Sequence, residues 1–233
     1  MKLRRALVPS LVMTLWVAFA AQGAAQPIGT NPKIPRLSDV QGAQAATWVA
    51  GLRKGGFVIF FRHAATNWRQ RDTDYGNFDN RDTQRNLSEA GKADAATIGT
   101  AFQDLGIPVD SVFTSPMWRC RDTADLAFGH GTVSLALFGK VPQTPGHVAE
   151  ADELRATYRA QRVRMLSEVP PPRQNRILVG QQDPMIPVIP GLHRDELREG
   201  DALVIQPLGK GQFKVLNLVT VADWTRLAGS ATP

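Results

Sequence analysis

The sequence predicts an α/β fold, a three-layer α/β/α sandwich around a mostly parallel sheet. Along the chain, segments with the apolar spacing of a helix alternate with short apolar runs, which is typical of strand–helix–strand units. The run GFVIFF, residues 56–61, lacks the polar alternation of a half-exposed strand and suits a strand that is covered on both faces. With 233 residues, the chain is long enough for one domain with a full hydrophobic core.

One helix is predicted before the strand at residues 56–61 in the sequence, and another after it. The first spans residues 39–54, where apolar residues recur at helical spacing. The second spans residues 87–106. Ser88 can cap this helix through its hydroxyl group, and Gly106 is a typical residue for its end.

A strand at residues 110–115 leads directly into the next predicted helix. Pro116 is expected at the first position of that helix, which runs over residues 116–129, and Ser115 is expected to cap it. A long polar helix over about residues 149–168 follows.

The last third of the chain is expected to complete the sheet. Residues 176–180 and 202–207 are predicted strands, and residues 213–221 are a candidate edge strand. In a sheet of this class, ligands bind beyond the carboxyl ends of the strands.

The first 25 residues have the composition of an export signal. A basic segment, KLRR, precedes an apolar stretch, and the small residues of QGAAQP offer a cleavage site after Ala25. The alternative is an uncleaved membrane anchor, but the apolar stretch is shorter than the ~20 residues that a spanning helix needs, and it contains Pro9. We therefore expect a signal peptide over residues 1–25, a proline-rich tether over residues 26–38 that lies extended on the surface, and one domain over residues 39–233.

Cysteine usage and charge narrow the class of protein further. Cys120 is the only cysteine, so no intramolecular disulfide can form, and we expect a periplasmic or secreted protein that depends on its core alone. The formal net charge is +6, and removing Lys2, Arg4 and Arg5 with the signal segment would leave 24 basic against 21 acidic residues, a charge of +3. Because this charge is small and scattered, we expect no nucleic-acid partner, and membrane contact only through the signal segment if it is uncleaved.

Three predicted strands end in polar residues that suggest a shared site. The strand ends read FFRHA, VFTSP and LVGQQ. Arg62 and His63 end the first strand, and Arg119 lies one turn into the helix after the second, where N–H groups and the helix dipole favour an anion. Taken singly, these residues are equally well explained as a basic pair at an exposed strand end and a surface arginine. Their expected convergence favours a phosphate site.

Together, these segments resemble the histidine phosphatase superfamily, the phosphoglycerate mutase-like enzymes. FFRHAATN is similar to the family's Arg-His-Gly signature, with Ala64 in place of the usual glycine. LSEAGKADAATIGTAF is similar to its L-T/S-x-x-G-x-x-Q-A helix, VFTSPMWRCRDTADLAFG to its S-S-P-x-x-R-A-x-x-T-A segment, and NRILVG to its last core strand. The resemblance covers about residues 56–220, and the small exported bacterial members also show a stretch like TQRNLSEAG.

The resemblance implies a mechanism without a metal or other cofactor. His63 would be the nucleophile and would form a phosphohistidine, for which its ring must be neutral. Arg62 and Arg119 would hold the phosphate oxygens, and Asn67 and Gln181 would contact the substrate.

One departure from the family pattern concerns Gln181. The family's last core strand ends in V-G-H, whereas this chain reads VGQQ, so Gln181 stands where the second histidine of the site is expected. A glutamine amide can donate a hydrogen bond to phosphate but brings no positive charge. Losing one preorganised donor typically lowers the rate about 10²–10³-fold, which puts catalysis rather than phosphate binding in question.

The resemblance implies that the general acid, which would protonate the leaving oxygen, is a carboxylate from the variable segment between the third and fourth motifs. Glu150 is the first candidate in VAEADEL, with Asp152 and Glu153 as alternatives, although acidic residues are also common in the first turn of any helix. The segment RQRDTDYGNFDNRD offers further carboxylates, but its spacing fits no metal loop, and it is expected to shape a lid or a substrate rim.

Two functions are compatible with these sequence features. The first is an exported phosphomonoesterase that acts, with full or reduced activity, through a phosphohistidine on His63. The second is a catalytically inactive relative that binds a phosphorylated ligand or a partner protein, which Gln181 favours. The expected partner is a phosphorylated small molecule or a phosphoprotein. A mutase is not favoured, because the extra substrate-binding segments of the family's mutases are not found.

Overall fold

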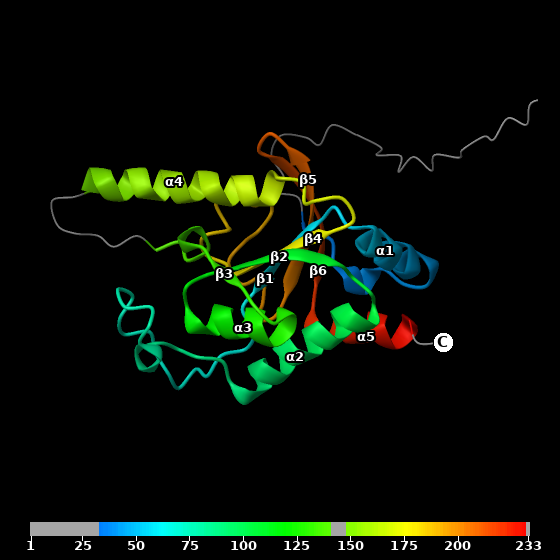
Figure 1. Ribbon diagram of the computed structural model, residues 1–233, viewed down its shortest axis with the longest axis horizontal. Coiled ribbons are helices and arrows are strands. Elements are labelled where there is room, and N and C mark those ends of the chain that lie inside the picture. The colour runs from blue at the N-terminus through cyan, green and yellow to red at the C-terminus, as the bar shows by residue number, and fades with distance from the viewer. Residues whose placement is uncertain (1–32, 141–147, 232–233) are drawn as a thin grey trace, which may run out of the picture. The chain divides into compact units, whose positions relative to one another are not determined.

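The computed structural model describes residues 33–140 and 148–231, and a six-stranded mixed sheet lies at their centre (Figure 1). The strand order is β3-β2-β4-β1-β5-β6. The first four of these strands run parallel to one another, and β5 is antiparallel to both of its neighbours. The strands are β1 (Val58–Arg62), β2 (Val109–Thr114), β3 (Thr132–Val133), β4 (Asn175–Gly180), β5 (Ala202–Gly209) and β6 (Gln212–Val219). The prediction of a mostly parallel sheet is confirmed, and β6 lies at the predicted edge.

Helices cover both faces of this sheet. In Figure 1, α4 lies on one side of the sheet, and α2, α3 and α5 lie on the other. The helices are α1 (Ala43–Lys54), α2 (Glu89–Asp104), α3 (Trp118–Phe128), α4 (Val148–Ser167) and α5 (Val221–Ala231), with short 3-10 helices η1 (Leu37–Asp39), η2 (Arg81–Thr83) and η3 (Leu135–Leu137). Among the described residues, no helix is long and apolar enough to span a bilayer.

The alternation of side chains along β1 explains why the sheet has two apolar faces. Phe61 points toward α2, α3 and α5, and its ring centroid lies 6.0 Å from that of Phe102 and 6.2 Å from that of Trp224. Phe60 points to the other face, where it shares a cluster of buried residues with Leu166 of α4. Both faces of β1 are therefore buried, which confirms the three-layer sandwich expected from its unbroken apolar run.

The N-terminal end of α3 differs from the prediction. Pro116 is not its first residue, because Met117 has an extended backbone (φ −67°, ψ 137°) and the helix begins at Trp118. Ser115 does not cap the helix. Instead, the side-chain oxygen of Gln84 accepts a hydrogen bond of 3.0 Å from the backbone N–H of Trp118. In contrast, Ser88 caps α2 as predicted, since its hydroxyl oxygen accepts from the N–H of Gly91.

Two other parts of the chain differ from the sequence prediction. The last residues of the expected surface tether belong to the packed domain, since Ile34 and Leu37 are buried and Leu218 N–H donates to the carbonyl of Pro35 at 2.8 Å. The C-terminal helix α5 was not predicted, although its Trp224 is fully buried under the sheet. The expected signal peptide over residues 1–25 and cleavage after Ala25 lie outside the described residues.

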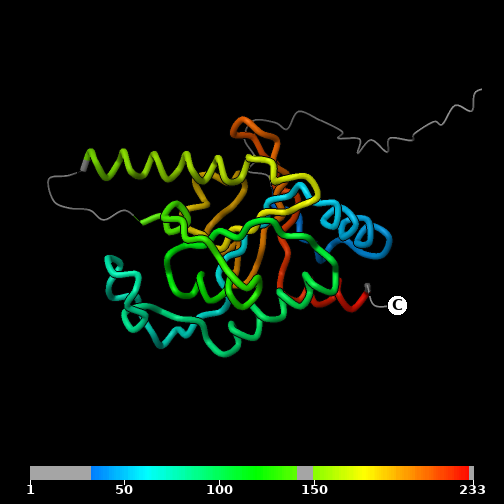
Figure 2. Tube along the Cα trace, in the orientation of Figure 1, coloured from blue at the N-terminus to red at the C-terminus, as the bar shows by residue number. Residues whose placement is uncertain are grey.

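The connection between β1 and α2, residues 63–88, is called here the β1–α2 segment. In Figure 2 it appears in cyan to blue-green and projects beside α3, away from the sheet. It contains a single short helix, η2, and is held by local hydrogen bonds such as that from Arg85 N–H to Asp72 Oδ1 at 2.9 Å. This segment follows directly from the carboxyl end of β1, so it lies where the ligand site is expected.

Candidate active site

A cavity of about 640 Å³ lies at the carboxyl ends of the parallel strands. Four of the residues predicted to form the site line it, namely Arg62, His63, Arg119 and Gln181. Arg62 ends β1 and pairs with Gly180, the last residue of β4, so the two strands deliver His63 and Gln181 side by side. The backbone N–H of His63 donates to the carbonyl of Gly180 at 3.1 Å, which fixes this arrangement.

The ring of His63 has a defined tautomer. Its Nδ1 lies 2.9 Å from the carbonyl oxygen of Ala64. Because a carbonyl can only accept, Nδ1 must carry the hydrogen, and in a neutral ring Nε2 then carries the free electron pair. An imidazole with Nε2 free is a competent nucleophile toward phosphorus.

Its surroundings also keep His63 neutral. The residue is 2% exposed. Burial lowers the pKa of His63 well below 6.5, and the charges of Arg119, Arg62 and Arg85 lower this pKa further. The hydrogen bond to Ala64 opposes these effects without outweighing them. His63 is therefore uncharged at neutral pH, and the three guanidinium groups around it favour this neutral form.

Two helices hold the chain immediately after His63. Thr123 of α3 accepts a hydrogen bond of 3.0 Å from Ala64 N–H through its hydroxyl oxygen, and that hydroxyl donates to Arg119 O at 2.7 Å. Gly91 in the first turn of α2 lies against the backbone of Ala65, so closely that a Cβ there would be 1.9 Å from the Ala65 oxygen. The glycine is therefore required by close packing, and it places the first turn of α2 directly behind the nucleophile.

The two predicted phosphate-binding arginines already have protein partners. Arg62 Nη1 donates to the carbonyl of Leu197 at 2.7 Å, and its Nη2 lies 3.7 Å from Glu199 Oε1. Arg119 Nη1 donates to Asp72 Oδ1 at 2.9 Å, while its Nε is buried and has no hydrogen-bond partner among the described residues. An unpartnered buried donor beside the cavity is what an anion site requires.

Arg85 and Glu199 are site residues that were not predicted from the sequence. Arg85 lines the cavity, and its Nη1 lies 3.2 Å from Glu199 Oε1. Glu199 also accepts from the N–H and hydroxyl of Thr66, at 2.9 Å and 2.8 Å. One carboxylate thus orients Arg62 and Arg85 and fixes the chain after the nucleophile. The stretch TQRNLSEAG pointed to the neighbourhood of Arg85, whereas Glu199 lies in an irregular loop with no pattern that reveals it.

Asp72 is the carboxylate that reaches Arg119 from the β1–α2 segment. It lines the cavity and is mostly buried, and it belongs to the stretch that was expected to form a lid or rim. A phosphate bound by Arg119 therefore has to compete with Asp72 for the same guanidinium group. Asp74 and Asp79 of the same stretch do not line the cavity.

Gln181 lines the cavity, but its amide group is turned toward α3. Its Nε2 donates to Cys120 Sγ at 3.3 Å, and its Oε1 is buried without a hydrogen-bond partner among the described residues. Burial raises the pKa of the Cys120 thiol to about 12, so this group stays protonated and can itself donate. A half-turn of the amide would let the thiol donate to Oε1 and would free Nε2–H from Cys120.

The structure does not bring Asn67 and Glu150 to the cavity. Asn67 Oδ1 accepts from the N–H of Arg69, a local turn contact, and Glu150 is exposed at the start of α4. Neither residue lines the cavity. The N-terminus of α3 offers fewer free N–H groups to an anion than expected, because the N–H of Trp118 already donates to Gln84 Oε1. Within residues 33–140 and 148–231, no group of His, Cys, Asp and Glu side chains is arranged to hold a metal ion.

Several solved structures are similar to this chain. One is a mutant phosphoserine phosphatase from Entamoeba histolytica in complex with phosphoserine, at 12% identity and a TM-score of 0.48, over 72% of this chain and 98% of that chain. Another is the protein histidine phosphatase SixA complexed with tungstate, at 12% identity and a TM-score of 0.47, with the same shares covered. A third is TTHB049 from Thermus thermophilus, at 17% identity and a TM-score of 0.43, over 70% and 98%. No curated protein matches the chain.

The sequence model of one family matches the part of the chain that holds the nucleophile candidate. It is described as the histidine phosphatase superfamily, branch 1, and it covers residues 58–137, from β1 to the end of η3. Arg62, His63 and Arg119 lie within this range. Residues 58–137 are therefore similar to the histidine phosphatase superfamily.

Proposed function

We propose that the protein is an exported phosphomonoesterase that acts through a phosphohistidine on His63. The observation that carries this proposal is the state of His63, a buried neutral imidazole whose Nδ1–H is held by Ala64 and whose Nε2 is free. Three guanidinium groups around it supply the positive charge that a transferring phosphoryl group needs.

In the first step, the electron pair of His63 Nε2 forms a bond to phosphorus, and the phosphorus–oxygen ester bond breaks. In the transition state, negative charge is spread over the phosphoryl oxygens, and the guanidinium groups of Arg119 and Arg85 stabilise this charge. The leaving oxygen takes up a proton and departs as an alcohol.

We propose Asp72 as the source of that proton, in place of Glu150. Asp72 lines the cavity next to Arg119, whereas Glu150 does not line it. When a phosphate takes over Arg119, Asp72 loses its ion-pair partner and comes to lie beside the phosphate. In the second step, water attacks phosphorus and returns a proton to Asp72, and the nitrogen–phosphorus bond electrons go back to Nε2.

Gln181 is proposed to act as a neutral donor to the phosphate in its rotated orientation. The protonated thiol of Cys120 is then the partner for the amide oxygen, which otherwise stays buried without a hydrogen bond. A neutral donor provides less transition-state stabilisation than the charged histidine expected there, so we propose a reduced rate.

The test is turnover of an aryl phosphate by the purified mature protein between pH 4 and pH 8. We expect turnover that His63→Ala abolishes, together with a phosphorylated protein intermediate that is stable to base and labile to acid. Folded protein without His63-dependent turnover at any pH in this range would overturn the proposal. Export is tested separately, by the cellular fraction and the N-terminal residue of the mature protein.

The second candidate function is phosphate-dependent binding without catalysis, and Gln181 favours it. In this function, the cavity holds a phosphorylated small molecule or a phosphoprotein, and the arginines bind without transfer. Saturable binding of phosphate that depends on Arg119, combined with no His63-dependent turnover, would support this function over the first.

A further inference from the structure

The cavity is larger than a single phosphoryl group requires, and its cations are not confined to the neighbourhood of His63. A volume of about 640 Å³ is in the range of sites for whole small molecules. α4 contributes Arg155, Arg159 and Arg162 to the lining, at the i, i+4 and i+7 spacing that places side chains on one helix face. The lining cations of the described residues are Arg62, Arg85, Arg119, Lys140, Arg155, Arg159, Arg162 and Arg194, and the lining carboxylates are Asp72, Asp183 and Asp195.

Arg162 is a buried guanidinium that has no carboxylate partner in the described part of the chain. Arg162 is 6% exposed. Its Nη1 donates to the carbonyl of Ala136 at 2.8 Å, and its Nε has no hydrogen-bond partner among the described residues. Burial lowers the pKa of Arg162, and the charge of Arg159 lowers it further. A buried cation beside another cation costs stability unless an anion is present, so the fold favours binding of one there.

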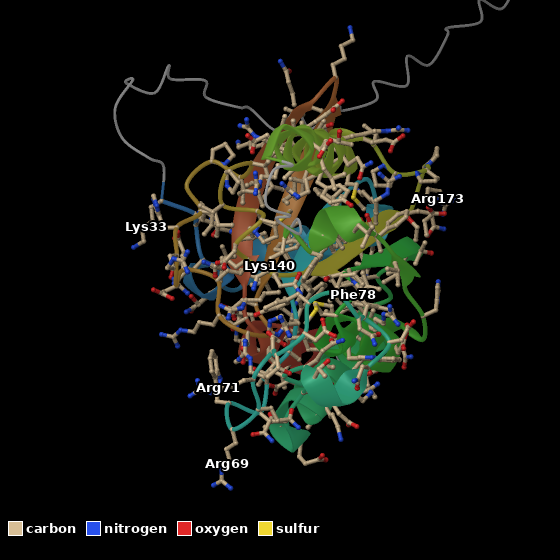
Figure 3. All side chains as sticks on the ribbon, turned by 90° about the vertical axis from the view of Figure 1, so that its left-hand side faces the viewer. Lys33, Arg69, Arg71, Phe78, Lys140 and Arg173 are labelled. Atoms are coloured by element: carbon tan, nitrogen blue, oxygen red, sulfur yellow. The ribbon has the colours of Figure 1, made fainter. Side chains whose placement is uncertain are left out.

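Arg159 lies one turn away and is also without an ion pair among the described residues. Its Nη2 donates to the carbonyl of Pro187 at 3.3 Å, which leaves its charge unbalanced. Lys140 enters the cavity from the loop after η3, where its Nζ lies 3.4 Å from the ring centroid of Tyr75. In Figure 3, Lys140 lies near the middle of the view, whereas Arg69 and Arg71, which do not line the cavity, lie toward the lower left.

The two ends of the cavity differ in how their charges are balanced. Beside His63, Asp72 and Glu199 pair with the arginines that face the nucleophile. On the α4 side, Arg159 and Arg162 contact only backbone carbonyls within the described residues. Arg159 and Arg162, which have no ion pair among the described residues, therefore lie at the end that the phosphoryl-transfer mechanism does not use.

We propose that the α4 side of the cavity is a second anion subsite, formed by Arg159, Arg162 and Lys140, and that the ligand is a small molecule with at least two phosphate groups. One phosphate lies at His63 and the other at α4. This inference rests on the proposed function for the role of the first phosphate, but the second subsite binds whether or not His63 reacts.

The test compares the binding of two inorganic probes, orthophosphate and tripolyphosphate, by calorimetry at about 0.15 M salt, where exposed charges are screened. We expect tripolyphosphate to bind at least tenfold more tightly than orthophosphate. Arg159→Gln is expected to lower the ratio of the two affinities about tenfold, since it removes a charge-assisted contact made only by the longer anion. Arg119→Ala is expected to weaken both probes.

Arg164→Gln is the matched control, because it removes the same charge from the same helix. Arg164 is exposed and does not line the cavity, so the affinity ratio should not change. Arg159 is exposed, and its substitution is expected to leave the protein folded. Arg162→Gln gives a second measurement of the same affinity ratio. This measurement is used only if the circular dichroism spectrum of the variant matches that of the unmutated protein.

The proposal is overturned if the two probes bind equally well, or if Arg159→Gln and Arg164→Gln change the ratio by the same factor. The same titrations in the His63→Ala background separate this outcome from failure of the proposed function. A preference for tripolyphosphate without any turnover supports the second subsite alone. His63-dependent turnover of an aryl phosphate with equal binding of the two probes supports the proposed function alone.

Discussion

The behaviour of this site depends on which atom of each polar side chain already has a partner. His63 is held neutral by burial and by the charges of the nearby arginines, while its hydrogen bond to Ala64 fixes the tautomer, so its reactivity is set by the fold and not by solution pH near neutrality. Gln181 is the opposite case, since its amide oxygen is buried without a partner among the described residues and its NH₂ group contacts Cys120. The first residue is arranged for the proposed chemistry, and the second limits it.

Gln181→His should raise the rate of aryl phosphate hydrolysis about tenfold. A protonated histidine there would donate a charge-assisted hydrogen bond that strengthens as charge builds on the phosphoryl oxygens, and ~1.4 kcal/mol of transition-state stabilisation is one decade in rate. The gain should disappear above the pKa of the new histidine. Turnover is measured at pH 5.5 and pH 8, with His63→Ala in both backgrounds as the control. A folded, phosphate-binding variant without His63-dependent turnover would favour the binding function.

Asp201 should make the stability of the protein depend on pH. Burial raises the pKa of this carboxyl to about 6 from an ordinary 3.8, against the hydrogen bond that its Oδ2 accepts from Arg198 N–H. The folded state therefore prefers the protonated form, and it loses stability as pH rises from about 4 to about 6. Asp201→Asn should raise the melting temperature more at pH 7.5 than at pH 4. An equal effect at both pH values would contradict this explanation.

Whole segments determine whether these residues meet. The β1–α2 segment supplies Asp72 and Arg85 to the cavity, and its Gln84 takes the first free N–H of α3. α2 and α3 together fix the chain after His63, through Gly91 and Thr123. The chain at the nucleophile is thus held in place by contacts with both α2 and α3.

Asp72→Asn separates two roles of the β1–α2 segment. Removing the negative charge that competes for Arg119 should tighten orthophosphate binding about fivefold, the order expected for a pair worth ~1 kcal/mol. If Asp72 is also the general acid, hydrolysis of an alkyl phosphate should fall more than that of an aryl phosphate, which needs less protonation of its leaving oxygen. Asp74→Asn, in the same segment but outside the cavity, is the control and should change neither property.

Gly91→Ala should destabilise the protein by about 3 kcal/mol or more. The added Cβ would lie 1.9 Å from the oxygen and 2.7 Å from the carbon of the Ala65 carbonyl, so the backbone after His63 must move. Gly51→Ala in α1 is the matched control, because a Cβ there meets nothing within 4 Å and alanine favours a helix by up to ~1 kcal/mol. Urea unfolding measures both variants, and similar free energies of unfolding for the two would contradict the close-packing argument.

In the molecule as a whole, the site joins the two faces of one sheet. Arg119 comes from α3 on one face, and Arg159 and Arg162 come from α4 on the other, while β1 and β4 deliver His63 and Gln181 between them (Figure 1). Ligand binding therefore links elements across all three layers, and its free energy should be visible in global unfolding.

Phosphate or vanadate should stabilise the protein by ~2.7 kcal/mol at a hundred times the dissociation constant. For a chain of this length, that corresponds to a rise of about 5–10 °C in melting temperature. Arg119→Ala should abolish the rise, while Arg121→Ala, on the same helix but outside the cavity, should preserve it. A rise that survives Arg119→Ala, or no rise in the unmutated protein, would mean that the anion site is not at this cavity.

The sequence alone determined the sheet and the identity of the residues that meet at its carboxyl edge. The unbroken apolar run of β1 requires two covered faces, and the strand ends carry Arg62, His63 and Gln181 into one place by the geometry of parallel strands. These features are local in sequence, or follow from a rule of topology, and both kinds can be recognised without coordinates.

Only the tertiary structure decided which charges face one another. Asp72, Arg85 and Glu199 come from irregular segments whose path depends on packing, so no periodicity places them at the site. In the structure, Asn67 and Glu150 do not line the cavity. The backbone N–H of Trp118 donates a hydrogen bond to Gln84 and not to a ligand site. Hydrogen bonds and ion pairs between distant segments depend on distances of a few ångströms, and such distances are fixed by the packed fold and not by residue order.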